Sequence, residues 1–126
     1  MARKTSILQE KSELYAFRIV KLYKYLLEEK HESLASKQIF RSGTSIGANI
    51  AEAQNAQSNA DFVNKLSIAL KETNETAYWL KVLYNGEFIN ESGYNFMLND
   101  NEEIAKMLVS SIKTLKQKIG VDDTVR

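Results

Sequence analysis

Metal binding is the first chemistry that the residue types suggest, because one acidic segment contains the only histidine of the chain. His31 lies three residues after Glu28. Glu-x-x-His is the spacing that di-iron carboxylate sites use on bundle helices. Such a site needs two of these pairs and two further glutamates, so one pair cannot complete it. The absence of cysteine excludes cysteine-ligated zinc, iron–sulfur clusters and thiol catalysis. The sequence therefore predicts no metal centre and no cofactor.

Three carboxylates remain as candidates for acid–base chemistry. Glu52, Glu72 and Glu75 fall among small or apolar residues, and general acid–base catalysis needs two titratable groups near one substrate atom. Glu52 follows Asn49 by three residues, which places both on one face of a helix. A serine–histidine–aspartate set would have to include His31, and nothing in its surroundings indicates one. We interpret the carboxylates as an inter-helix polar network and predict that the protein is not an enzyme.

Two groups of basic residues are candidates for contact with nucleic acid. The predicted contacts are Arg18, Lys21 and Lys24 early in the chain, and Lys113 and Lys116 near its end. Tyr25 adds an aromatic side chain to the first group, and such mixed surfaces bind single strands by charge and stacking. The opposing interpretation is that long cationic side chains solvate outer helix faces. Seventeen basic and sixteen acidic residues leave a net charge of +1, so bulk attraction to nucleic acid or to an anionic membrane is not expected.

Length and composition are those of one soluble domain. The chain has 126 residues, of which 44% are hydrophobic and 26% charged, and we treat residues 1–126 as a single domain. No stretch reaches the roughly 18 apolar residues of a membrane-spanning helix. The charged start is not followed by an apolar segment of signal-peptide length. These features predict a cytoplasmic protein that does not enter a membrane.

The spacing of apolar residues predicts helices throughout the chain. Proline is absent and glycine occurs five times, so the turn residues of an all-β chain are missing. Apolar residues instead recur at alternating steps of four and three. The predicted helices span about residues 6–30, 37–56, 59–85 and 92–119. Residues 99–101 weaken helix propensity and could kink or split the last helix. Four long helices with short connections favour an all-α, antiparallel up-down-up-down four-helix bundle.

The second predicted helix is unusual in its small residues. Gly43 and Gly47 lie in its interior, where each glycine costs about 1 kcal/mol of helix propensity relative to alanine. A helix that keeps both is expected to approach a neighbouring backbone closely. Ser36 is predicted to cap the start of this helix, and Ser58 with Asp61 forms a capping box for the next helix.

Two helices carry more apolar surface than one bundle can bury. Leu14 and Phe17 lie outside the main apolar rows of the first helix, and Tyr78, Trp79 and Val82 extend the apolar face of the third. Monomeric proteins rarely expose contiguous apolar patches above about a few hundred Å², so another subunit is expected to cover part of this surface. The pattern predicts a homo-oligomer without setting its number of subunits.

One segment of the second helix resembles a family signature. Residues 41–52 read Arg-Ser-Gly-Thr-Ser-Ile-Gly-Ala-Asn-Ile-Ala-Glu, and this string is similar to the signature of the four-helix bundle proteins also called the 23S ribosomal RNA intervening-sequence proteins. The matching positions are Arg41, Ser42, Ser45, Ile46, Asn49, Ile50, Ala51 and Glu52. Compatible patterns in the other helices extend the resemblance over nearly the whole chain.

The resemblance implies a fold, a setting and partners. It implies a left-handed antiparallel bundle in the bacterial cytoplasm, assembled as a ring-shaped homopentamer and without enzymatic activity. Some members of the family are encoded within insertions in ribosomal RNA genes. Related proteins are accessory factors of diversity-generating retroelements, in which a basic pentamer engages nucleic acid and a reverse transcriptase. RNA or a reverse transcriptase is therefore the partner that the resemblance implies.

Three features depart from the family pattern. Gly47 stands where the family often has proline, and Ala53 where it has glycine. The neutral run 54–59 replaces a common basic residue, which favours fewer contacts with phosphate groups. We predict a non-enzymatic oligomeric bundle that acts as an RNA-associated scaffold. The alternative is a protein–protein interaction module without nucleic-acid contact, and a small hydrolase is the third class.

Overall fold

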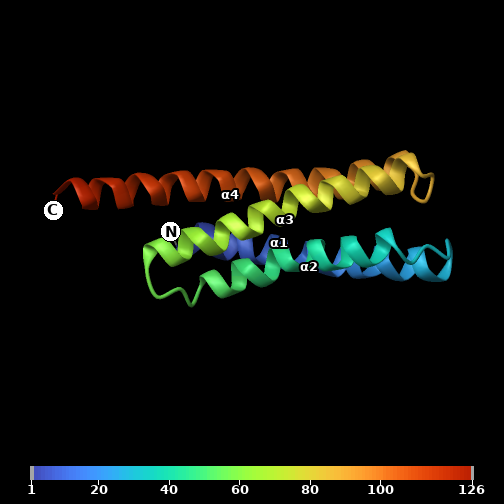
Figure 1. Cartoon of the computed structure of the whole chain (residues 1–126), viewed down its shortest axis with the longest axis horizontal. Helices are drawn as coiled ribbons and strands as arrows, with labels where there is room; N and C mark the ends of the chain where they lie inside the picture. Colours follow the sequence, from blue (N-terminus) through green and yellow to red (C-terminus); the bar gives the residue numbers. More distant parts are fainter. Residues whose placement is uncertain (1, 126) are drawn as a thin grey trace.

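The chain folds into four helices (Figure 1). The structure is a computed structural model, which describes the backbone of residues 2–125 and the side chains of residues 7–120. The helices are α1 (Ala2–Glu28), α2 (Ala35–Ala53), α3 (Asn59–Asn85) and α4 (Glu91–Val125). No strand occurs between residues 2 and 125. The prediction of an all-α four-helix bundle is therefore confirmed.

Each helix packs on its neighbours in chain order. Successive helices run in opposite directions (Figure 1). α2 packs closely on both α1 and α3, and α3 packs on α4, whereas α1 and α4 touch more sparsely. The seam between the first and last helices is thus the most open side of the bundle. The left-handed twist that the resemblance implies stays a prediction.

Apolar side chains spaced by three and four residues meet in one core. Those with no solvent exposure include Leu8, Ile19 and Leu26 of α1, Ile39, Ile46 and Ile50 of α2, Leu66, Leu80 and Leu83 of α3, and Leu108 of α4. Burying one such side chain contributes about 1.5–3 kcal/mol, before the entropy of ordering the chain is subtracted. On α1 the core takes one apolar row and leaves Leu14 and Phe17 outside it.

Close approach of α2 to α1 explains a glycine inside a helix. Gly43 is buried, and a Cβ placed there would lie 2.7 Å from the Cδ1 and Cγ1 atoms of Ile19. A side chain at this position would therefore overlap α1. At Gly47 the nearest atom to an added Cβ would be the Ser12 carbonyl oxygen, at 3.3 Å. The prediction that small residues of this helix mark close helix contact is confirmed.

A carboxylate from the preceding turn caps the start of α2. The Glu32 side chain accepts hydrogen bonds from the backbone N–H groups of residues 34–36, at 2.8–3.1 Å. Ser36 lies inside α2, and its hydroxyl donates to the Glu32 carbonyl at 2.8 Å, so the prediction of Ser36 as N-cap is wrong. The chain turns at His31, whose φ is +54°. A cap supplied across this turn satisfies backbone donors that the first helical turn leaves free.

The helix ends differ from the predicted bounds by up to six residues. α3 spans residues 59–85 as predicted, and the Ser58 hydroxyl accepts from the Asp61 N–H at 3.0 Å. α1 begins four residues earlier than predicted and ends two residues earlier, because the chain leaves the helix before the turn at His31. α2 ends at residue 53 rather than 56, and α4 continues to residue 125 rather than 119.

α4 continues through residues 99–101 without a break, although a kink was one expectation. Asn101 is 2% exposed, and its Nδ2 donates to the Thr73 carbonyl of α3 at 2.8 Å. Asp100 pairs with Arg18 of α1. These bonds to two neighbouring helices compensate for the weak helix propensity of this segment.

Candidate functional site

The carboxylate Glu52 joins α2 to α3, as a polar network predicts. Its Oε2 lies 3.6 Å from the Lys65 Nζ, and the Glu52 side chain is 64% exposed. Asn49 does not reach a neighbouring helix through its Nδ2, which donates to the Ser45 carbonyl within α2 at 2.9 Å. An exposed ion pair of this kind stabilises a protein by about 0–1 kcal/mol. Glu52 is therefore a minor structural contact.

Glu72 has the most perturbed carboxyl group of the α2–α3 surface. Burial raises the pKa of Glu72, and the charge of Glu75 raises it further, while a hydrogen bond with Ser45 and the charges of Arg41 and Lys71 lower it. Perturbed carboxyls are candidates for proton transfer when they line a cleft. The four hollows in the surface described below are lined by other residues. Glu72 thus lies on an open helix face.

His31 and Glu28 do not form a metal site. Both side chains are exposed at the end of α1. Across the part of the chain that the structure describes, no group of three or more histidine, cysteine, aspartate or glutamate residues is placed to hold a metal ion. The same part of the chain contains no helix long and apolar enough to cross a membrane.

Arg18 is engaged within the bundle. Its Nη1 pairs with the Asp100 Oδ2 of α4, and its guanidinium carbon lies 4.9 Å from the ring centroid of Phe96. Two turns earlier on α1, the Lys11 Nζ pairs with the Glu103 Oε1. These two cations hold the sparse α1–α4 seam together, so the charge of Arg18 is already balanced by a carboxylate.

The other predicted nucleic-acid contacts are exposed and lie apart. Lys21 and Lys24 are on the outer side of α1, and Lys113 and Lys116 are on α4. Lys113 follows Asp100, the partner of Arg18, by thirteen residues, and this spacing is about 20 Å along a helix axis. The structure does not bring the five predicted residues into one patch.

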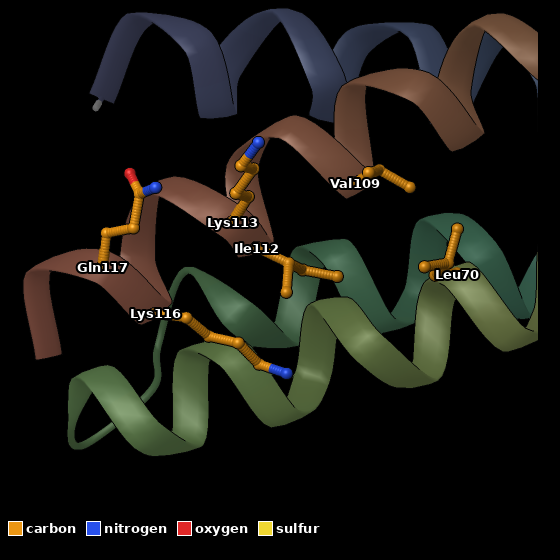
Figure 2. A pocket seen from close by; sticks show the side chains of 6 residues that line it. All are labelled: Leu70, Val109, Ile112, Lys113, Lys116 and Gln117. Carbon is orange, nitrogen blue, oxygen red and sulfur yellow. The ribbon is translucent and has the colours of Figure 1, made fainter. Parts of the chain in front are cut away.

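An apolar hollow lies between α3 and α4, where Leu70, Val109 and Ile112 form the floor of an open groove (Figure 2). Its volume is about 460 Å³, and its rim includes Lys113, Lys116 and Gln117. Lys116 reaches toward α3, while Lys113 and Gln117 point to the other side of α4 (Figure 2). An apolar floor with cationic edges suits an amphipathic ligand or protein segment.

Three further hollows are polar or small. One of about 610 Å³ lies near the α3–α4 connection and includes Tyr25, Tyr84 and Phe88. A second, of about 60 Å³, lies at the α1–α4 seam, and a third, of about 180 Å³, lies beside Gly47. None of these linings contains Glu52, Glu72 or Glu75. The seam hollow contains Asp100 and Glu103, which are paired with Arg18 and Lys11.

Large apolar side chains are exposed on several helices. Leu34, in the turn before α2, is 80% exposed, and within the helices the most exposed are Leu14, Phe17, Tyr78, Phe96 and Val109, each 48–59% accessible. Tyr78 stacks edge-on against Trp79, which is half-buried. Leu14, Phe17 and Phe96 belong to the two helices at the open seam. Leu14 and Phe17, which lie outside the predicted core rows of α1, are therefore at the bundle surface.

The signature segment divides between the core and the α2 surface. Ser42, Ile46 and Ile50 are buried, Ser45 and Asn49 are half-buried, and Arg41, Ala51 and Glu52 are exposed. The Ser42 hydroxyl accepts a hydrogen bond from the Thr76 hydroxyl of α3 at 2.9 Å. The buried half of the signature thus packs in the core, while Arg41 and Ser45 interact with Glu72 of α3.

Sequence reasoning missed the polar bonds between helices. Asn101, Thr73 and Thr76 are buried, and their bonds join α2 and α4 to α3. Their signal in the sequence is a polar residue at a position where the three–four spacing expects an apolar one. The pairing of Arg18 with Asp100 has no such signal, because 82 residues separate the two.

These observations define the class of protein: an all-α four-helix bundle with exposed apolar side chains and an open groove. The family model of the 23S rRNA-intervening sequence proteins matches residues 4–110. The chain belongs to this family. Among curated proteins none matches it.

A solved structure agrees with this assignment. It is a crystal structure at 1.70 Å of a protein of unknown function from the S23 ribosomal protein family of Bacteroides thetaiotaomicron. The two chains are 56% identical with a TM-score of 0.87, and the match covers 87% of this chain and 98% of that chain. Neither description names an enzymatic activity.

Proposed function

We propose that this protein is a non-enzymatic scaffold that associates with itself and holds partners on its outer helix faces. One observation carries the proposal. Leu14, Phe17 and Phe96 are 48%, 57% and 54% exposed on the two helices that flank the open seam. The core is complete without them. In water such side chains gain free energy when another protein surface covers them.

The candidate site residues support binding rather than turnover. Glu72 lies on an open helix face, and the apolar groove is lined by Leu70, Val109 and Ile112. Catalysis by carboxylates needs an enclosed site in which two such groups reach one substrate atom. Open apolar surfaces with cationic edges instead recognise partners.

Homo-oligomerisation is the form of self-association that we propose. The number of five copies in a closed ring comes from the family resemblance, and the mass in solution tests it. Size-exclusion chromatography with light scattering should give a mass above the 14.4 kDa of one chain. Phe96→Ser should lower that mass, or make the oligomer dissociate at a higher protein concentration than the wild type. Leu34→Ser, which alters an exposed apolar side chain in the turn before α2, is the matched control.

RNA association is the second candidate. It is favoured by Lys106, Lys113 and Lys116, which are exposed along α4 and make no ion pair with the side chains of residues 7–120. The family name refers to a ribosomal RNA intervening sequence, and RNA or a reverse transcriptase is the partner we propose for this surface. A protein partner without nucleic acid remains the alternative.

Salt dependence tests the RNA candidate. Each phosphate contact releases counterions, so binding to a short labelled single-stranded RNA should weaken steeply as salt rises. Lys113→Glu with Lys116→Glu should reduce the slope of log K against log salt by about 2. Lys37→Glu with Lys71→Glu makes the same charge change elsewhere and should leave the slope unchanged. Binding that is absent at low salt contradicts the RNA candidate and leaves self-association standing.

A further inference from the structure

The groove between α3 and α4 opens where the two helices part. They are joined by the connection after Asn85 and diverge toward the C-terminal end of α4 (Figure 1). Val109 is 51% exposed in this region, and Leu70 and Ile112 lie beside it in the same hollow (Figure 2). The bundle therefore supplies an apolar floor and leaves it open to water, where covering it would gain free energy.

The helix segments that border the groove carry lysines and no acidic residues. Residues 62–71 of α3 contain two lysines, residues 104–121 of α4 contain four, and neither segment contains an aspartate or a glutamate. The chain as a whole has a net charge of only +1. Lys106 and Lys116 are exposed and make no ion pair with any side chain that the structure describes. Charge complementarity therefore favours an occupant with carboxylates or phosphates.

The lysines flank the apolar floor along the axis of α4. Lys106 precedes Val109 by three residues and Lys116 follows it by seven. Three and seven residues are close to one and two helical turns, so the three side chains leave α4 on the same side. The two lysines are ten residues apart, which is about 15 Å along a helix axis. A second helix laid along this side would meet a cation, an apolar centre and another cation.

We infer that this groove binds an acidic amphipathic helix of a partner protein. The inference rests on the proposed scaffold function and names the chemistry of the partner. Leu70, Val109 and Ile112 cover the apolar face of such a helix, whose apolar residues recur at steps of three and four. Lys106 and Lys116 face carboxylates that lie about ten residues apart on the same helix.

The floor of the groove favours a protein partner over RNA. Single-stranded nucleic acid gains much of its contact energy by stacking bases on aromatic rings. None of the six residues that line the groove is aromatic, and Leu70, Val109 and Ile112 are aliphatic. Aliphatic floors of this kind take the leucine, isoleucine or valine side chains of an amphipathic helix. Lys116, a candidate contact for phosphate, therefore faces a carboxylate in the occupied groove.

A synthetic peptide tests the groove. The probe is a fluorescent peptide of about 18 residues, with leucines at steps of three and four on one face and glutamates about ten residues apart beside them. Fluorescence anisotropy should show saturable binding to the wild-type protein. A peptide of the same composition in scrambled order, and one with lysine in place of glutamate, should bind at least about 10-fold more weakly. Equal binding of all three peptides, or no binding of the probe at about 1 mM, overturns the inference.

Val109→Ser separates a protein partner from RNA, because it shortens the apolar floor without changing charge. Val109 is 51% exposed, so the variant should fold, which circular dichroism checks. Binding of the probe should weaken about 5- to 10-fold, while binding of single-stranded RNA should keep its wild-type value. Leu34→Ser is the matched control, because Leu34 is 80% exposed in the turn before α2. A Val109→Ser protein that binds the probe as tightly as the wild type overturns the inference.

Charge reversal tests the two lysines. Lys106→Glu with Lys116→Glu should weaken binding of the acidic probe at least about 10-fold and strengthen binding of the lysine peptide. Lys21→Glu with Lys24→Glu makes the same charge change on exposed positions of α1 and should leave both peptides unaffected. Loss of RNA binding without loss of probe binding in the α4 variant would assign these lysines to nucleic acid and overturn the inference.

A single cysteine locates the bound helix, because the chain contains none. Val109→Cys places a thiol on the floor of the groove. A probe with cysteine in place of its central leucine should form a disulfide with this variant faster than with Leu34→Cys, although Leu34 is the more exposed position. Equal rates of disulfide formation overturn the groove as the binding site.

The mass in solution keeps this inference apart from the proposed self-association. A monomeric wild type that binds the probe overturns self-association and supports the groove. An oligomeric wild type that does not bind the probe overturns the groove and leaves self-association standing. A lower mass for Val109→Ser than for the wild type would assign the groove to another copy of this chain and overturn the partner helix.

Discussion

Replacing Gly43 by alanine tests how closely α2 approaches α1. The added Cβ would stand 2.7 Å from two carbons of Ile19 and 3.0 Å from a third. Ile19 has no solvent exposure, so its side chain cannot turn away into water. Overpacking costs about 1–3 kcal/mol, and the better helix propensity of alanine offsets about 1 kcal/mol. We expect Gly43→Ala to lower the free energy of unfolding by about 1–2 kcal/mol, and Gly43→Leu to lower it more.

Urea unfolding followed by circular dichroism measures this change. Several protein concentrations are needed, since association adds to apparent stability. Gly120→Ala is the matched control, because a Cβ at that position would meet no heavy atom within 4 Å beyond its chain neighbours and the nearby backbone of its own helix. Ile19→Val should cost about 0.5–1.5 kcal/mol alone and less in the Gly43→Ala background, where it removes the overlap. If Gly43→Ala is as stable as the wild type, the close contact between α1 and α2 is refuted.

Three further predictions concern charged side chains. Glu32→Ala should lower the unfolding free energy by about 1–2 kcal/mol, because three backbone N–H groups lose their acceptor, whereas exposed Glu29→Ala should leave the melting temperature unchanged. Glu52→Gln should change the free energy of unfolding by less than about 0.5 kcal/mol, because the ion pair with Lys65 is long and exposed. A folded variant that loses a defined turnover would instead identify an enzyme. Burial and Glu75 raise the pKa of Glu72 above its ordinary 4.5, so the folded state keeps this proton after the unfolded chain has lost it. The free energy of unfolding should therefore fall as pH rises through the raised pKa. Between about pH 4 and about pH 7 this fall should be smaller in Glu72→Gln than in the wild type, and an equal fall in both proteins would contradict this assignment.

Local patterns in the sequence were sufficient for the fold. The three–four spacing of apolar residues depends on helix geometry alone, and it predicted α3 at residues 59–85 to the residue. Gly43 signalled close helix contact because a glycine inside a helix needs a compensating reason. Leu14 and Phe17 lay outside the predicted core rows, and both are exposed.

Two kinds of contact could not be predicted from the sequence: a helix cap that depends on a turn, and pairs between distant segments. The cap at the start of α2 comes from Glu32 because the turn at His31 brings the carboxylate to the helix end, and no spacing rule contains that turn. Arg18 was grouped with Lys21 and Lys24 because they are close along the chain, but Asp100 engages Arg18 across the seam. Helix phase predicts which residues share a face and not which residue of another helix lies opposite.

The mass of the wild-type protein in solution tests the central claim most directly. Sedimentation equilibrium over the micromolar range should give a mass that is a multiple of 14.4 kDa and that falls on dilution, because the proposed self-association covers the exposed apolar side chains of α1 and α4. A mass of 14.4 kDa at every concentration would contradict the claim that this bundle is a self-associating scaffold.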